Sequence, residues 1–306
     1  MFELNRQFSF IKNRKIYYLV SIAVILLGLM VGGIRGFNMG IDFTGGTMIQ
    51  IDLGKQVAEN QVQDILKSEK IEAEVVHAGE NNEQVVIRTT QSLDNNARQA
   101  LFGKFYDQFD LTQESVLTVE QFGPSVGEMM TSNALKALAI ATILMLLYIV
   151  VRFEWKFAVA AVACLVHDVL VMVSFYGLFH VPINNPFIAA ILTIVGYSIN
   201  DTIVVFDRIR ENLKLMKKSK LEELIDTSIN QTLIRSIMTS VTVIAVIIPL
   251  LILGGTTIRQ FILPMLVGAV AGTLSTTFMA SPLYYELCML VDKPKYRGKR
   301  SKKDLE

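Results

Sequence analysis

The sequence is poor in cysteine, histidine and charge. Of its 306 residues only two are cysteine and three are histidine, and their spacing matches no zinc site. No pattern of a Ser or Cys nucleophile and no cofactor motif is present, so we expect no enzyme, no metal and no cofactor. Charged residues make up 19% of the chain, whereas soluble domains carry roughly a quarter. The low charge argues against an ordinary soluble protein.

Long apolar runs take the place of the missing charge. Hydrophobic residues make up 52% of the sequence, and its mean hydropathy is +0.43. A helix needs about 20 mostly apolar residues to cross a bilayer. The first run has no small-residue cleavage site close behind it, which indicates a membrane span rather than a signal peptide. Six runs predict six transmembrane helices, at about 16–34, 134–151, 157–179, 187–206, 233–253 and 261–290.

Lysine and arginine are unevenly distributed along the chain. Of the 29 such residues, 20 fall in four segments, which are 1–16, 152–156, 207–235 and 291–306. Six spans place all four segments on one side of the membrane, and an excess of these residues in short loops marks the cytoplasmic side. We therefore expect a cytoplasmic N-terminus (1–15) and a cytoplasmic basic tail (291–306). Because these residues flank spans, we expect them to meet the lipid bilayer and no nucleic acid.

The segment 35–133, between the first two spans, is long enough to be an extracytoplasmic domain; the remaining five spans occupy 134–290. The periodicity of segment 35–133 predicts the order strand, helix, strand, strand, helix, strand. This is the ferredoxin-like βαββαβ order of an α+β domain. Asp94 or Asn95 is the expected cap of the second helix. The domain's one histidine, His77, has no nucleophile pattern beside it, so a binding or force-transmitting role is favoured over catalysis.

A carboxylate interrupts the fourth apolar run. Asn200 and Asp201 lie there, and an ionised carboxylate at the centre of a bilayer costs about 2.5–3.5 kcal/mol. Arg235, at a similar depth in the next span, is the expected partner. Together with Thr202, these side chains form a polar lining that can hold water for an ion path. The alternative is a fixed ion pair that only joins two helices.

The third span contains a second polar pair, His167 and Asp168. Two interpretations are open: the pair belongs to the ion path, or neighbouring helices simply satisfy it in the core. Glycines spaced four residues apart predict close helix contacts elsewhere in the spans. They are Gly28 with Gly32 and Gly268 with Gly272.

Several motifs together resemble a known family. GIDFTGGT (40–47) follows the first span, VGYSINDTIVVFDRIREN (195–212) closes the fourth, and QTLIRSIMTS (231–240) opens the fifth. They resemble the SecF family, the smaller membrane subunits of the bacterial SecDF complex, which belongs to the RND-like superfamily. HDV in the third span and FGPSVG before the second are similar too. The resemblance covers nearly the whole chain.

This resemblance implies a function. A SecF-type chain is half of an RND-type transporter in the bacterial inner (plasma) membrane and forms a heterodimer with SecD. The pair uses a proton or sodium gradient to assist late export of unfolded preproteins through SecYEG, after SecA has begun the process. The resemblance places ion coupling at Asp201 and Arg235. It also identifies a motif at the outer membrane surface, which consists of Gly40, Ile41, Asp42, Phe43, Gly45 and Gly46.

Two other functions stay open at this point. One is a self-contained secondary transporter, against which the missing internal repeat argues. The other is a structural scaffold of the translocon without ion conduction.

Overall fold

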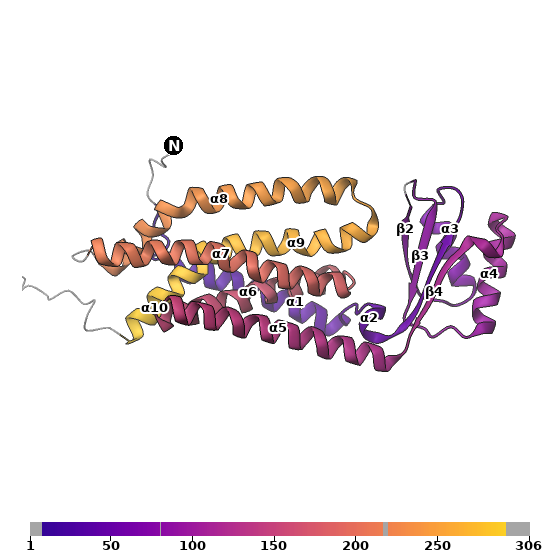
Figure 1. The fold of residues 1–306 in the computed structure, drawn as a ribbon, viewed down its shortest axis with the longest axis horizontal. Helices are drawn as coiled ribbons and strands as arrows, with labels where there is room; N and C mark the ends of the chain where they lie inside the picture. The colour runs from indigo at the N-terminus through magenta and orange to yellow at the C-terminus, as the bar shows by residue number, and fades with distance from the viewer. Residues whose placement is uncertain (1–7, 80, 217–219, 292–306) are drawn as a thin grey trace, which may run out of the picture.

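The computed structural model describes residues 8–79, 81–216 and 220–291. Most of the predicted basic tail, and the first seven residues, lie outside the described residues. The described chain has two parts, which are a bundle of long helices and a small sheet domain at one end of that bundle (Figure 1).

Six helical segments are long and apolar enough to cross a membrane, which confirms the predicted number. Five are single helices: α1 (Arg14–Arg35), α5 (Pro124–Arg152), α6 (Trp155–Phe179), α7 (Asn185–Leu215) and α8 (Leu221–Leu253). The sixth consists of α9 (Thr256–Ser275), a π-helical segment (Thr276–Ala280) and α10 (Ser281–Val291). Such π segments are rare and often occur at functional sites.

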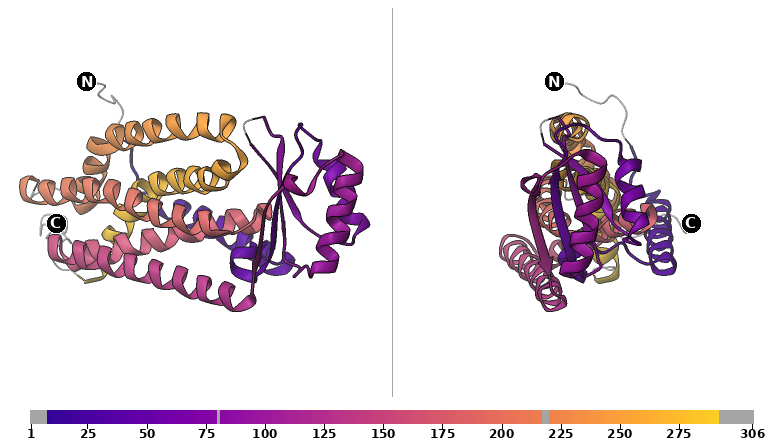
Figure 2. Two further views of the ribbon diagram at one scale, coloured as in Figure 1. Left: turned by 45° about the vertical axis from the view of Figure 1, so that its right-hand side comes forward. Right: turned by 90° about the vertical axis from the view of Figure 1, so that its right-hand side faces the viewer.

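The helices differ in how much of their surface other helices cover. Half of the apolar window of α6, of α7 and of the sixth segment is buried, against 6% for α5 and 11% for α1. Figure 2 shows α5 and α8 on opposite flanks of the bundle. The exposed apolar faces of α1 and α5 fit a surrounding of lipid or of another apolar chain.

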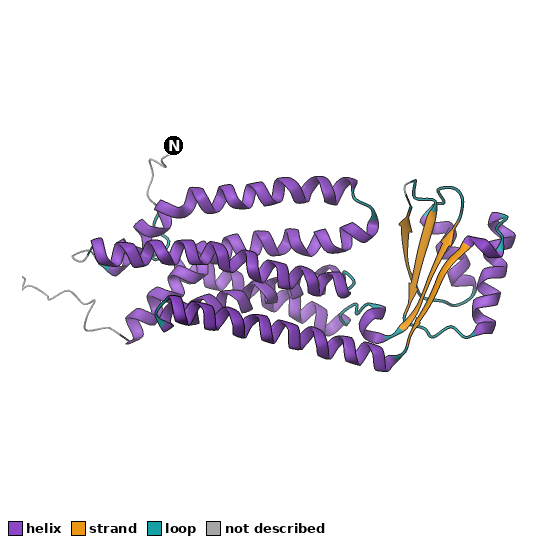
Figure 3. Cartoon of the chain, in the orientation of Figure 1, coloured by secondary structure: helices purple, strands orange, loops and turns teal. Residues whose placement is uncertain are grey.

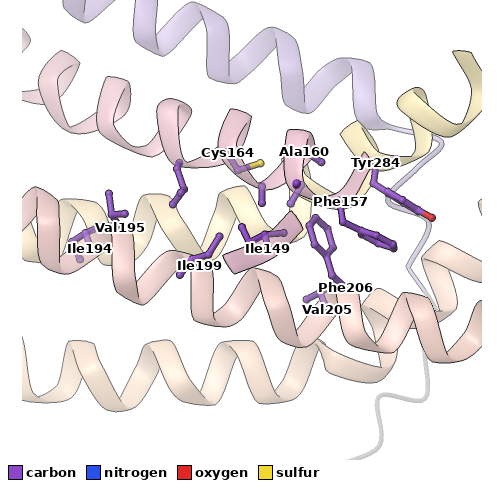
Figure 4. Close-up of a cluster of buried hydrophobic side chains, with 14 of the residues drawn as sticks. Ile149, Phe157, Ala160, Cys164, Ile194, Val195, Ile199, Val205, Phe206 and Tyr284 are labelled. Atoms are coloured by element: carbon purple, nitrogen blue, oxygen red, sulfur yellow. The ribbon is translucent and has the colours of Figure 1, made fainter. Parts of the chain in front are cut away.

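Aromatic rings pack between α6, α7 and α10, toward the end of the bundle that is far from the sheet domain (Figures 1 and 4). The rings of Phe157 and Tyr284 stack with 3.9 Å between their centroids, and Phe206 lies 4.9 Å from Phe157. All three side chains are buried. These contacts hold α10 against the two most buried helices.

Glycines bring pairs of helices into backbone contact, as their spacing predicted. A Cβ added to Gly28 of α1 would lie 2.4 Å from the carbonyl oxygen of Ser174 on α6. One added to Gly268 of α9 would lie 2.6 Å from Ile194 on α7. A larger side chain at Gly28 would meet the backbone of α6, and one at Gly268 would meet the side chains of Ile194 and Met172, so at either position the neighbouring atoms would have to move.

The sheet domain has the predicted βαββαβ order. Its elements are β1 (Gly46–Asp52), α3 (Glu59–Ser68), β2 (Glu74–Ala78), β3 (Gln84–Thr89), α4 (Asn95–Phe109), a 3₁₀ turn (Gln113–Ser115) and β4 (Val116–Phe122). The strands form one antiparallel sheet in the order β2-β3-β1-β4. Helices α3 and α4 lie on one side of the sheet, and the other side is turned toward the bundle (Figure 3).

Local sequence explains these elements. Ile49 and Ile51 alternate with polar residues along β1 and are fully buried under the two helices. Asp94 caps α4 by accepting the backbone N–H of Ala97 at 2.8 Å, which is one of the two caps expected from the sequence. The ring of His77 contacts the carbonyl oxygen of Val57 at 2.7 Å, so this histidine joins β2 to the loop before α3.

Candidate functional site

Two aspartates are buried in the middle of the helix bundle. Asp168 of α6 is 2% exposed, and Asp201 of α7 is 6% exposed. A buried carboxylate is costly unless hydrogen bonds or a partner charge compensate the lost hydration. The two groups differ in how hydrogen bonds compensate this cost.

Asp168 has a partner for each of its oxygens. Its Oδ2 accepts hydrogen bonds from the hydroxyls of Ser198 at 2.6 Å and Ser275 at 2.9 Å. Its Oδ1 lies 3.0 Å from Nδ1 of His167, whose other ring nitrogen contacts the hydroxyl of Ser21. The carboxylate therefore connects α6 with α7, α9 and, through the imidazole, α1. This arrangement is compatible with a polar pair that its neighbours satisfy, and a place of His167 and Asp168 in the ion path stays a prediction.

Asp201 is satisfied on one side only. Its Oδ1 accepts a hydrogen bond from the hydroxyl of Ser236 on α8, at 2.7 Å. Its Oδ2 is buried and has no hydrogen-bond partner within the described residues. A bare carboxylate oxygen of this kind is ready to accept a proton, a water or a cation.

Arg235 does not reach Asp201 directly. It precedes Ser236 on α8, but its side chain lies at the surface of the chain, and in the described part of the molecule its guanidinium forms no ion pair. Ser236 occupies the contact that the sequence led us to expect from the arginine. The two charged residues are thus neighbours across the α7–α8 contact without touching.

The other predicted residues of α7 divide between surface and core. Asn200 is exposed, although it lies inside an apolar run. Thr202 is buried, and its hydroxyl lies 3.0 Å from that of Thr276, the first residue of the π segment. Thr202 thus joins α7 to the irregular part of the sixth span.

Small hydroxyl side chains fill the space between α7, α8 and α9. The hydroxyl of Ser240 lies 2.6 Å from that of Thr273, and Tyr197 donates to Ser240 at 3.1 Å. Ser236, Ser275 and Thr276 were not among the residues expected at the site. A signal for Ser275 and Thr276 was in the sequence, because LSTTFMASP (274–282) places a polar run inside the last apolar segment.

The glycine motif lies between the bundle and the sheet domain. Ile41 and Phe43 are buried in α2 (Ile41–Thr44), a single turn that packs on α5. Gly45 and Gly46 have positive φ angles of 76° and 147°, a backbone region that favours glycine. Asp42 contacts the first residue of α7. The motif residues therefore form a junction rather than a part of the buried aspartate site.

Two protein families match segments of this chain. The family described as "Protein export membrane protein SecD/SecF, C-terminal" matches residues 104–289, and the "SecD/SecF GG Motif" family matches residues 32–57. The protein translocase subunit SecF of Sebaldella termitidis is 40% identical over 299 residues, which cover 96% of each chain. The protein translocase subunit SecDF of Bacillus subtilis is 34% identical, over 98% of this chain and 39% of its own.

A solved structure is similar as well. The crystal structure of SecDF from Thermus thermophilus, described as a translocon-associated membrane protein, superposes with a TM-score of 0.81 at 36% identity. The match covers 94% of this chain and 39% of that one, so this chain corresponds to about two fifths of the solved protein. The sequence motifs, the six spans, the sheet domain and these matches lead to one conclusion: the chain belongs to the SecF family of protein translocase subunits.

Proposed function

We propose that this chain is the SecF half of a heterodimer with a SecD-like chain, and that the pair uses a transmembrane proton or sodium gradient to assist protein export. In this proposal Asp201 binds the coupling ion. The relatives' name, protein translocase subunit, supports the transport role, and the fused SecDF relatives support the pairing with SecD.

The observation that carries the proposal is the bare oxygen of Asp201. Oδ2 is buried within the span and has no donor among the described residues, while Oδ1 accepts a hydrogen bond from Ser236. An isolated carboxylate oxygen at this depth costs free energy, which binding of a proton or a cation relieves. Because Asp201 is buried and has a single hydrogen bond within the described residues, we expect the site to have a lower free energy with a bound proton or cation than without one.

The gradient supplies enough free energy for a conformational step. One elementary charge that crosses the membrane releases about 2.3 kcal/mol per 100 mV. Each unit of pH difference adds about 1.4 kcal/mol per proton. A few kcal/mol shifts a two-state equilibrium from near balance to about a hundred to one.

The surface position of Arg235 and Asn200 supports a partner chain. Both lie at the surface of the isolated chain, in helices whose composition is apolar enough to cross a membrane. Charged and amide side chains inside spans normally face protein or a water-filled cavity rather than lipid. A SecD-like chain that covers α7 and α8 would enclose them. It would also bring Arg235 into a closed site, where its movement toward Asp201 releases the bound ion.

The remaining assignments follow from the Lys and Arg distribution and from the family. We place the chain in the bacterial inner membrane with both termini in the cytoplasm and the sheet domain outside. The complex acts on unfolded preproteins that leave SecYEG, after SecA has started their transfer.

The test is export of a slowly exported preprotein in cells whose only copy of the chain carries one substitution. Asp201→Asn keeps the size and the hydrogen bond from Ser236 but removes the titration. Arg235→Met removes the charge from α8. We expect both variants to accumulate normally with the SecD-like chain and to lose the dependence of export on the membrane gradient.

Asp207→Asn is the matched control, because it removes a carboxylate from the same helix six residues later. We expect export at the parent level in this variant. If Asp201→Asn and Arg235→Met also export with an unchanged dependence on the gradient, the chain is a structural scaffold and the ion-coupling proposal fails.

A further inference from the structure

The segment that carries the glycine motif is hydrogen-bonded to the start of α7. Gly40 donates its backbone N–H to the carbonyl of Ile183 at 2.6 Å, and Ile183 donates to the carbonyl of Asn38 at 2.8 Å. Asp42 adds a side-chain contact, because its Oδ2 accepts the backbone N–H of Asn185 at 2.8 Å. Asn185 is the first residue of α7. Two distant parts of the chain are therefore joined at this helix end.

Asp42 takes the role that a capping residue of α7 itself would normally have. The residue at the N-cap position is Asn184, but its side chain makes no capping hydrogen bond. Its buried Oδ1 has no hydrogen-bond partner among the described residues. The free N–H groups and the dipole at a helix N-terminus favour a carboxylate. The first turn of α7 is thus held by a side chain from another segment.

The other end of the motif is fixed to the sheet domain. β1 begins at Gly46 and lies between β3 and β4, at the centre of the sheet. A Cβ added to Gly46 would lie 2.1 Å from the carbonyl oxygen of Thr89, so the chain enters the sheet in direct backbone contact. Few residues separate Asp42 from this central strand. Because only residues 43–45 lie between Asp42 and β1, a displacement of Asp42 is passed on to this strand.

Helix α7 connects the same contact with Asp201. The two ends of this connection, Asn185 and Asp201, are separated by about 24 Å of continuous helix. A helix of this kind moves as a rigid element on the scale of its packing contacts. Asp201 and Asp42 thus both act on helix α7. Asp201 lies within the span, and Asp42 contacts the end of the helix beside the sheet domain.

We propose that Asp42 is a positioning residue that transmits movement of α7 to the sheet domain. This inference rests on the proposed function, in which ion binding at Asp201 moves α7. Asp42 does not bind the ion. It keeps the glycine-motif segment attached to the helix end, so that an axial shift or rotation of α7 pulls on the central strand.

Three variants separate transmission from simple capping. Asp42→Ala removes the side-chain contact and leaves the backbone hydrogen bonds of Ile183 with Asn38 and Gly40 in place. Asp42→Asn keeps an oxygen that accepts the same hydrogen bond. The double variant Asp42→Ala with Asn184→Asp gives α7 a cap of its own in place of the side chain from the glycine motif. Asn184 has the extended backbone that suits a capping residue (φ −135°, ψ 179°).

The measurement uses the full chain with its SecD-like partner in proteoliposomes. Spin labels at Asn96→Cys on α4 and at Phe179→Cys, the last and exposed residue of α6, report the distance between the sheet domain and the bundle. We expect an imposed ion gradient to change this distance in the parent and in Asp42→Asn. The size of the change should agree within about twofold, since Asn and Asp are similar capping residues. Asp42→Ala and the double variant should both show a clearly smaller change, because only the backbone hydrogen bonds with Ile183 then join the motif to α7.

Each other outcome has a definite meaning. If the double variant regains the change in distance, Asp42 is only a cap and the inference is overturned. It is overturned equally if Asp42→Ala responds like the parent. If the parent does not respond, or if Asp201→Asn responds like the parent, the proposed function itself fails, and the inference fails with it.

A backbone variant tests the same contact independently. Gly40 has an ordinary φ of −66°, so alanine is not strained there. Its Cβ would nevertheless lie 2.8 Å from the carbonyl oxygen of Ile183 and would push the motif away from the start of α7. Gly40→Ala should reduce the response to the gradient, whereas Gly103→Ala, at a position with open space around it, should leave the response unchanged.

Discussion

The two buried aspartates of the bundle have similar burial but different hydrogen bonding. Asp168 has two serine hydroxyls on one oxygen and an imidazole on the other. Asp201 has one serine on one oxygen and no partner, among the described residues, on the other. The first group is held from three sides, and the second is held from one.

The difference indicates two different uses of a carboxylate inside a membrane. A fully satisfied network rigidifies the helices that contribute to it, because every hydrogen bond would be lost if one helix moved. A half-satisfied carboxylate stores unfavourable free energy that a mobile ligand releases. We therefore regard Asp168 as a structural joint of the bundle and Asp201 as the candidate ion site. The following predictions test this comparison.

Asp168→Ala should have the largest effect on stability. Removal of one partner from a buried, hydrogen-bonded pair typically costs about 3–5 kcal/mol, and here it also leaves His167 and two serines without their acceptor. Cys164 and Cys288 are both buried, so the reaction of a thiol-specific dye during heating reports unfolding. Phe8→Ala, at the surface, is the control and should unfold like the parent. An unchanged unfolding temperature in Asp168→Ala would contradict the assignment of a joint.

Ser236→Ala should destabilise the chain more than Ser198→Ala does. A hydrogen bond to a charged group contributes about 1.5–3 kcal/mol. Ser236 is the one donor to Asp201 among the described residues, whereas Asp168 retains His167 and a second serine when Ser198 is lost. The same thiol assay compares the two variants. Equal losses would show that the two aspartates are satisfied alike, against the comparison drawn above.

Asp201→Asn should change stability by less than about 1 kcal/mol while it abolishes the response to the gradient. Replacement of a buried charge by a neutral group of the same shape is often neutral or stabilising. The readouts are thermal unfolding and export, measured on the same membranes. A loss of stability as large as that of Asp168→Ala would place both aspartates in the structural class.

Glu74 of β2 provides a reference carboxylate outside the membrane helices, with the smallest expected effect. Burial raises the pKa of Glu74, and the nearby Arg88 opposes this shift only in part. Because the pKa is higher in the folded state, folding favours the protonated acid. The contribution of Glu74 to the stability of the sheet domain is therefore greatest below the unfolded pKa of about 4.3 and is lost as the pH rises through the folded pKa.

Glu74→Gln should remove this decline. Amide hydrogen exchange of β2 and β3 in the full chain, corrected for the intrinsic effect of pH, measures it from about pH 4 to about pH 7. The control is Glu114→Gln, at an exposed position. We expect protection from exchange to fall with rising pH in the parent and to stay level in Glu74→Gln. If the two proteins show the same pH dependence, burial does not raise the pKa of Glu74.

Much of the fold was predictable from local patterns. Apolar runs revealed the six spans, because a bilayer sets a minimum length for each helix. Period-two alternation in TMIQIDL and the Asp94 cap revealed elements of the sheet domain, since both depend on residues close together in the chain. The glycine pairs revealed close helix contacts, although the partner helices became known only from the structure.

The candidate site was predictable in part. Asp201 stood out because a charge in an apolar run is costly wherever it lies, and Asp168 stood out for the same reason. Their partners did not stand out, because serine is common in spans and carries no charge. The rotation of α8 decides that Ser236, and not Arg235, donates to Asp201. The π segment and the packing of α9 decide that Ser275, more than a hundred residues away in the chain, donates to Asp168.

The sequence by itself determined which segments are apolar and long enough to cross a membrane and which family the motifs resemble, because hydropathy and local motifs act over short stretches of chain. Only the tertiary structure decided which of the two aspartates is satisfied and that Asp42 caps a helix beginning at residue 185. Whether a hydrogen bond forms depends on differences of a few tenths of an ångström in the separation of two atoms that belong to different helices. Those distances follow from how the helices pack against one another, which no single segment encodes.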